Sequence, residues 1–218
     1  MGSVARMPWG AVTLALVAGW VNAVGLLGFE HQSISHLSGL ATLLGAAGAQ
    51  GQGAQGLHLL AIVICFWLGA VVSGARLVAA NERRGPLLLH GCDTILLAFE
   101  ALLFAASYWI LAEGSAIGHY TASAACGLQN AMTTQLSRGQ IRSTHVTGLF
   151  TDLGLMLGAR LRGERLHGGR VAAFALLIIG FIAGGGLGAT MFNLLHYGAL
   201  LIPAGLCAAL ALFSRFWR

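Results

Sequence analysis

A short polar motif occurs twice in this chain, about half the chain length apart, and the sequence around both copies is apolar. The first copy is His-Leu-Ser-Gly-Leu-Ala-Thr-Leu-Leu-Gly at 36–45, and the second is His-Val-Thr-Gly-Leu-Phe-Thr-Asp-Leu-Gly at 145–154. Counted from Ser35 and Thr144, six of eleven aligned positions are identical. Because shared histidine and threonine are uncommon in an apolar chain, we interpret the pair as an internal repeat, which constrains the architecture before any single helix is considered.

A shorter pair of similar segments precedes the two motifs. Gly-Trp-Val-Asn-Ala occupies 19–23, and Gly-Leu-Gln-Asn-Ala occupies 127–131. Since the two pairs have nearly the same offset, the similarity extends beyond one motif. We therefore expect one compact membrane domain built from two repeats, residues 1–114 and residues 115–218.

The composition is typical of a membrane protein. Hydrophobic residues make up 57% of the sequence and charged residues 9%, whereas soluble domains carry roughly 25% charged residues. All twelve basic residues are arginines. They do not form the basic face of a nucleic-acid-binding protein, so the expected partner is the lipid bilayer and no nucleic acid. The four cysteines show no CxxC spacing, and we interpret them as small apolar side chains.

Six segments are apolar over about 20 residues, the length with which a helix crosses a bilayer. Two further apolar pieces, at 36–50 and 145–161, are shorter and rich in glycine and alanine, which suits half-membrane or re-entrant helices. We therefore expect an all-α integral membrane protein with six transmembrane helices and two half-helices. The expected spans are 7–29, 57–80, 87–112, 117–136, 170–192 and 196–214.

The arginines predict the orientation of these spans. Cytoplasmic loops of membrane proteins are enriched in arginine and lysine, and the loops near 30–57, 113–118 and 193–196 contain neither. All arginines fall on the opposite side if the N- and C-termini are both cytoplasmic. Because three spans per repeat is an odd number, the two copies must run in opposite directions. The sequence thus predicts a 3+3 inverted-topology repeat, an architecture that many secondary transporters share.

The motifs at 127–131 and 144–154 resemble those of a known family. They are similar to the YoaK-like family, bacterial six-span membrane proteins classed as a domain of unknown function, and the similarity covers almost the whole chain. The first copy departs from the family's usual Ser-His-Met-Thr-Gly-Asn, since Leu40 stands where the family has asparagine. The resemblance implies a location in the bacterial inner membrane and a transport role, and it supplies no substrate.

The starts of the two half-helices form the candidate binding site. A helix that begins inside the membrane presents unpaired N–H groups and the positive end of its dipole. Two such starts that meet near the midplane would suit a small polar or anionic solute. Alternatively, the same residues only cap and pack the re-entrant turns. The residues are Ser38 and Thr147 as expected caps, Gly39 and Gly148 for close approach, and Thr42 and Thr151 one turn further on.

Five further polar side chains lie near these starts or within spans. His36 and His145 immediately precede the half-helices, where each either bonds a backbone carbonyl or acts on a substrate or proton. Asn22, Gln129 and Asn130 lie within spans, where amides either cross-link helices or bind substrate. Both interpretations stay open at this point.

Two carboxyl groups are candidates for proton coupling. Glu100 lies near the middle of the third span, where an ionisable side chain is costly and usually functional. Asp152 occupies the position of Leu43 in the other copy, and it either takes part in coupling or pairs with Arg142. Asp93 lies seven residues before Glu100, on the same helix face. We expect it to lie with His90 near the cytoplasmic interface, where it forms a structural pair.

The remaining patterns concern packing and chemistry. Gly180, Gly184 and Gly188 form a GxxxGxxxG stripe that allows tight helix contact, either within the monomer or in a homodimer. The sequence contains no HExxH or GxSxG pattern, so we expect no enzyme and neither a cofactor nor a metal. The expected function is a small secondary transporter or permease, and the alternative is a non-transporting membrane scaffold or sensor.

Overall fold

The described part of the protein is helical throughout. The computed structural model describes residues 9–28, 34–84, 93–137, 139 and 142–216. Within these ranges every regular element is a helix. The elements are α1 (Trp9–Gly28), α2 (Leu37–Ala49), α3 (Gly53–Arg84), α4 (Thr94–Ala112), α5 (Ile117–Leu136), α6 (Val146–Leu161), α7 (Gly168–Leu195), the 3-10 helix η2 (His196–Leu200) and α8 (Leu201–Phe216).

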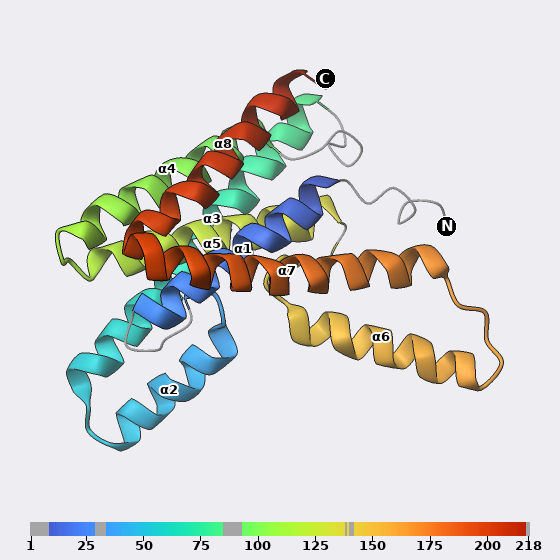
Figure 1. The fold of residues 1–218 in the computed structure, drawn as a ribbon, viewed down its shortest axis with the longest axis horizontal. Coiled ribbons are helices and arrows are strands. Elements are labelled where there is room, and N and C mark those ends of the chain that lie inside the picture. Colours follow the sequence, from blue (N-terminus) through green and yellow to red (C-terminus); the bar gives the residue numbers. More distant parts are fainter. Residues whose placement is uncertain (1–8, 29–33, 85–92, 138, 140–141, 217–218) are drawn as a thin grey trace.

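Long apolar helices identify this chain as an all-α membrane protein. The apolar stretch Gly168–Ser214 contains α7 and most of α8, and the chain turns back between these helices at η2 (Figure 1). Large apolar side chains on the outer surface, such as Trp67 and Leu102, are more than half exposed, as lipid-facing side chains are. The expected beginning of the third span near residue 87, together with His90, lies outside the described residues. Among the residues that the structure describes, four stretches are long and apolar enough to cross a bilayer: Gly10–Gly28, Gly53–Ala79, Thr94–Ala112 and Gly168–Ser214.

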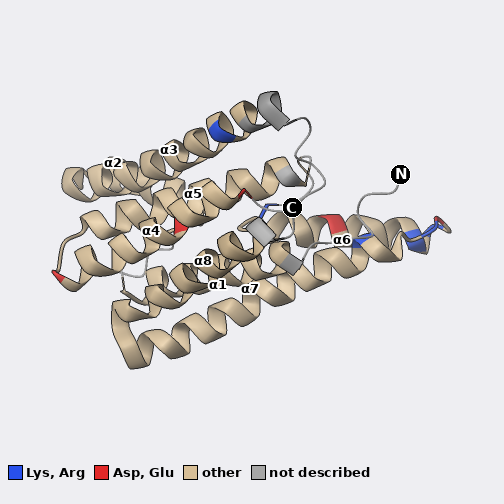
Figure 2. Cartoon of the chain, turned by 90° about the horizontal axis from the view of Figure 1, so that it is seen from above, with Lys and Arg blue, Asp and Glu red and all other residues tan. Residues whose placement is uncertain are grey.

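The two short helices lie at the side of the bundle that the long helices form (Figure 1). Each packs mainly on one long helix, α2 on α3 and α6 on α7. Seen in both Figure 1 and Figure 2, α2 and α6 extend toward opposite ends of the bundle. The start of α1 and the end of α8 lie toward the end from which α6 extends.

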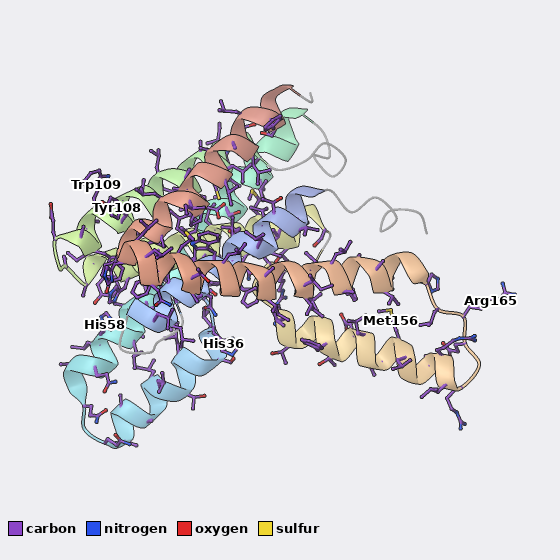
Figure 3. The ribbon with its side chains drawn as sticks, in the orientation of Figure 1. His36, His58, Tyr108, Trp109, Met156 and Arg165 are labelled. Atoms are coloured by element: carbon purple, nitrogen blue, oxygen red, sulfur yellow. The ribbon has the colours of Figure 1, made fainter. Side chains whose placement is uncertain are left out.

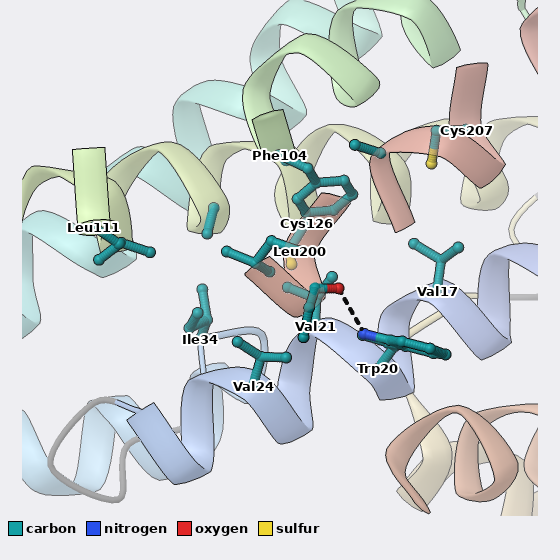
Figure 4. Packing of buried hydrophobic residues seen from close by; sticks show 14 of the residues in the cluster. Val17, Trp20, Val21, Val24, Ile34, Phe104, Leu111, Cys126, Leu200 and Cys207 are labelled. Carbon is teal, nitrogen blue, oxygen red and sulfur yellow. Dashed lines mark hydrogen bonds between the residues drawn. The ribbon is translucent and has the colours of Figure 1, made fainter. Parts of the chain in front are cut away.

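The main buried core is formed by α1, α4, α5 and α8 together with η2 (Figure 4). Phe104 of α4 is fully buried between Cys126 of α5 and residues of α8. The indole of Trp20 in α1 donates a buried hydrogen bond of 3.0 Å to the carbonyl of Ala199 in η2. This bond connects α1 to the turn between α7 and α8.

Two pairs of long helices cross in the same manner. In each pair, one glycine of either helix lies directly against a backbone carbonyl of the other helix, at a place where a Cβ atom would collide with backbone. Only glycine permits this approach, because it has no Cβ. The contacts are Gly19 with Phe181 and Gly184 with Leu16 between α1 and α7, and Gly127 with Phe66 and Gly69 with Ala124 between α3 and α5.

The glycine stripe of α7 packs inside the chain. Gly180, Gly184 and Gly188 are buried, and their Cα atoms face the backbone of α1 at Val12, Leu16 and Trp20. Of the two alternatives for this stripe, packing within the monomer is therefore the one that the structure has. A homodimer through the same glycines would require α1 to leave its place, since α1 covers them.

Candidate functional site

The two half-helices begin with the same geometry. His36 is the N-cap of α2 with φ −97°, and His145 is the N-cap of α6 with φ −96°. Neither cap residue forms a side-chain hydrogen bond to the helix start. The expectation that Ser38 and Thr147 cap these helices is therefore wrong, because both lie within the first turn of the helix, two residues after the cap.

The first-turn N–H groups are consequently not used by the helices themselves. The first intrahelical bonds run from Leu40 to the carbonyl of His36 (3.1 Å) and from Leu149 to the carbonyl of His145 (3.2 Å). The three N–H groups before each of these lack an intrahelical acceptor, as at any helix start. With no side-chain cap among the described residues, these N–H groups are available to water or to a ligand.

An asparagine of a long helix holds the start of each short helix, α1 for α2 and α5 for α6. The hydroxyl of Ser35, directly before His36, donates to Oδ1 of Asn22 in α1 (2.9 Å). The hydroxyl of Thr144, directly before His145, donates to Oδ1 of Asn130 in α5 (3.0 Å), and its N–H points to the same oxygen (3.4 Å). Both asparagines therefore hold the chain in place where it enters a half-helix. Binding of a substrate is not needed to explain them.

The two matched threonines bond to their own helices. Thr42 donates to the carbonyl of Ser38 (3.0 Å), and Thr151 donates to the carbonyl of Thr147 (2.9 Å). All of these residues are exposed on the described part of the protein. Because their protons are already used, the threonine hydroxyls can offer a ligand only an acceptor.

The glycines in the first turn make room for the cap histidines. A Cβ atom on Gly148 would collide with the imidazole of His145, and one on Gly39 would come within 3.2 Å of the imidazole of His36. The hydroxyl of Ser38 also lies 3.2 Å from Nε2 of His36. The close approach that these glycines permit is thus used first by a histidine ring of the same chain.

A hollow of about 230 Å³ lies at the start of α6. Its polar lining comes from Arg142, His145 and Asp152, together with the backbone at Gly139 and Gly148, and Leu149 supplies an apolar wall. All three polar side chains are exposed. No residue of α2 lines this hollow, and neither do the asparagines or Glu100. The structure thus brings one arginine, one histidine and one carboxylate to a helix start.

Arg142 was expected only as a partner for Asp152 or as part of the positive cytoplasmic side. Both residues line the hollow, but the ion pair that occurs among the described side chains joins Arg76 and Asp93 instead (3.4 Å). The signal that could have identified Arg142 as a site residue is its position six residues before Gly148, in the loop that leads into the helix start.

Gln129 has a structural role. Its side-chain amide is buried and donates to the carbonyl of Leu14 in α1 (2.6 Å). The backbone carbonyl of Gln129 accepts from the hydroxyl of Thr133 one turn later (3.0 Å). Of the two interpretations for amides within spans, cross-linking of helices accounts for this residue.

Glu100 lies in the bundle core and away from the hollow. It is fully buried, and neither of its carboxyl oxygens has a conventional hydrogen-bond partner among the described residues. The thiol of Cys207 lies close enough for a weak hydrogen bond, and Cys126 is also nearby. A buried carboxylate without a cation costs several kcal/mol, so a change of charge here requires water or a cation to enter.

Asp93 is structural, as expected. Its carboxylate caps α4 by accepting from the N–H groups of Ile95 (3.0 Å) and Leu96 (3.1 Å). It also pairs with Arg76 of α3. A carboxylate at a helix start is favoured by both the free N–H groups and the helix dipole, and the arginine balances its charge.

One family model matches nearly the whole chain. The family is described as a protein of unknown function, DUF1275, and its model matches residues 10–213. No curated protein and no solved structure matches the sequence. The match agrees with the resemblance of the motifs to an uncharacterised family, and it assigns no activity to any residue.

Proposed function

This chain belongs to the DUF1275 family, and we propose that it is a small secondary transporter of the bacterial inner membrane that takes a small anionic or polar solute. The observation that carries this proposal is the uncapped start of α6, which opens into a hollow with Arg142 and His145. A helix start and a guanidinium group both favour negative charge. The proposed solute therefore has a carboxylate or a phosphate group.

The proposed architecture is six spans in a 3+3 inverted repeat, with the halves 1–114 and 115–218. Three matched features support it. The α1–α7 and α3–α5 pairs cross through reciprocal glycine contacts. Asn22 and Asn130 each accept a hydroxyl proton from the residue before a cap histidine. The half-helices α2 and α6 extend toward opposite ends of the bundle (Figure 1), as inverted copies would.

The proposed orientation has both termini in the cytoplasm. Figure 2 shows the described arginines toward the end from which α6 extends, while the turn between α4 and α5 at the other end carries none. Positive charge accumulates on the cytoplasmic side of membrane proteins. The hollow at the start of α6 would then be reached from the cytoplasm, and the start of α2 from the outside.

Proton coupling is proposed for Asp152 and Glu100. An anion bound beside Arg142 would also lie near the carboxylate of Asp152, because both line the same hollow. A proton taken up with the anion would remove the repulsion between the two negative groups. Glu100, buried without a cation, would exchange its proton only in a conformation that admits water to the core.

Reconstituted protein tests this proposal. Liposomes that contain a trapped pH-sensitive dye receive an inward gradient of succinate or of inorganic phosphate. If the protein carries an anion together with a proton, the lumen acidifies faster than in protein-free liposomes. Arg142→Gln is expected to abolish this difference, because it removes the positive charge of the hollow.

A matched control uses another arginine of the same helix region. Arg160 lies near the end of α6 and does not line the hollow, so Arg160→Gln is expected to retain the wild-type rate. Equal rates for wild type and protein-free liposomes with both anions would refute the anion transporter. That result would favour the non-transporting scaffold or sensor.

A further inference from the structure

Two histidines and a tyrosine meet where α3 and α5 begin. His58 is in the second turn of α3, and His119 and Tyr120 are in the first turn of α5. All three are half-buried. Nε2 of His58 lies 3.3 Å from Nδ1 of His119, and Nδ1 of His58 lies 2.8 Å from the hydroxyl of Tyr120. The cluster lies toward the end of the bundle away from Arg165 (Figure 3).

The distance between the two ring nitrogens matches that between two ligands of one metal ion. Imidazole nitrogens bind Zn²⁺ at about 2.0–2.1 Å in tetrahedral geometry, which places two of them about 3.3 Å apart. The imidazole planes are inclined by 74°. The torsion that turns a histidine ring is soft, so both lone pairs can be directed to one point between the rings.

Tyr120 supplies an acceptor for the tautomer of His58 that such binding requires. A histidine that binds a metal through Nε2 must carry its proton on Nδ1, and that N–H usually donates to an oxygen nearby. In His58 the oxygen at this place is the phenol of Tyr120. With its proton on Nδ1, His58 donates to this hydroxyl and directs Nε2 at His119.

We propose that Nε2 of His58 and Nδ1 of His119 bind one divalent transition-metal ion of the Zn²⁺ or Cu²⁺ class. No group of three or more histidine, cysteine or acidic side chains suited to a metal occurs in the described ranges. Water therefore completes the coordination sphere, and the ion exchanges readily. Because the two ligands belong to α3 and α5, the bound ion holds the first turns of these two helices together.

Calorimetric titration of the purified protein with ZnCl₂ tests the proposal. The protein is kept in detergent and carries no polyhistidine tag, since a tag would bind the same ions. His58→Gln and His119→Gln are each expected to weaken Zn²⁺ binding at least about 10-fold, and the double variant no more than either single change, because both nitrogens hold one ion. Cu²⁺ is expected to bind more tightly than Zn²⁺, and Mg²⁺, which prefers oxygen ligands, is expected not to bind.

Two further variants separate metal binding from general effects. Tyr120→Phe retains both ligands and is expected to weaken Zn²⁺ binding by about 10-fold, the usual consequence of losing a hydrogen bond behind a ligand. His167→Gln removes an exposed histidine at the start of α7 and is expected to bind Zn²⁺ like wild type. Wild-type protein that binds no Zn²⁺, or binding that is unchanged in both single histidine variants, would overturn the proposal. It does not depend on transport, because the titration measures binding alone.

Discussion

Replacing Gly184 by alanine tests one of the close glycine–carbonyl contacts between long helices. A Cβ atom at this position would lie against the carbonyl group of Leu16, with the carbonyl carbon at 2.7 Å and Cα at 2.9 Å. Normal contacts of this kind exceed about 3.4 Å, because van der Waals attraction is optimal near 3.5–4.0 Å. The neighbouring atoms are backbone, so relief requires α1 and α7 to move apart.

The expected cost follows from two opposing effects. Overfilling a well-packed contact costs about 1–3 kcal/mol, and backbone that cannot rotate away places this site toward the upper end. Alanine regains up to about 1 kcal/mol of helix propensity relative to glycine. The net loss in the free energy of unfolding is therefore about 1–2 kcal/mol. For a chain of this size each kcal/mol corresponds to roughly 2–4 °C in Tm.

Gly186 provides a matched control on the same helix. It is exposed, and nothing lies within 4 Å of a Cβ atom built on it. Gly186→Ala should therefore keep or slightly raise Tm, because only the propensity gain applies. Unfolding is followed by tryptophan fluorescence in detergent, since Trp20 is buried beside this contact. If Gly184→Ala is as stable as Gly186→Ala, the crossing of α1 and α7 is not as close as described.

Three further predictions concern the site and the topology. Glu100→Gln should leave the protein folded and remove the pH dependence of solute flux, because the amide cannot take up or release an acid proton. A solute flux with an unchanged pH profile would exclude Glu100 as the coupling group. Asn130→Ala should speed hydrogen exchange at the start of α6 and leave the start of α2 unchanged, because an interhelical hydrogen bond in a membrane contributes about 0.6 kcal/mol on average. Mass spectrometry of the exchanged peptides measures these rates. Equal effects at both starts would contradict a local role for Asn130. A cysteine placed at Gln52 should react with a membrane-impermeant reagent in intact cells, whereas a cysteine placed at Arg165 should react only after lysis. Labelling of position 165 in intact cells would refute the six-span topology.

Helix positions follow closely from the sequence. The half-helices expected at 36–50 and 145–161 extend over Leu37–Ala49 and Val146–Leu161. Apolar length and the polar motif at each start are local signals, and local signals suffice for helix boundaries. The predicted capping residues lie two positions after the observed ones, His36 and His145, because capping depends on the backbone angles at those residues.

Side-chain roles within the motifs were predicted less well. The sequence identified Asn22 and Asn130 as notable, but it left open whether they bind a solute or hold helices. In the structure each amide oxygen accepts from the hydroxyl before a cap histidine, a contact that no sequence pattern had indicated. Likewise, Gly148 was expected to admit a ligand, whereas the imidazole of His145 already occupies the space beside it.

By itself, the sequence determined the membrane class and the helix positions, because apolar length and charge can be read along a single chain. Only the tertiary structure decided which faces meet. His58 and His119 are 61 positions apart and share no motif, yet their rings touch. In the sequence, Gly184 is only one member of a glycine stripe, whereas in the structure α1 covers it. Which faces meet depends on how each helix is rotated about its axis and how it crosses its neighbours. Close glycine–carbonyl contacts between distant segments set these angles, and spacing along one helix does not encode them.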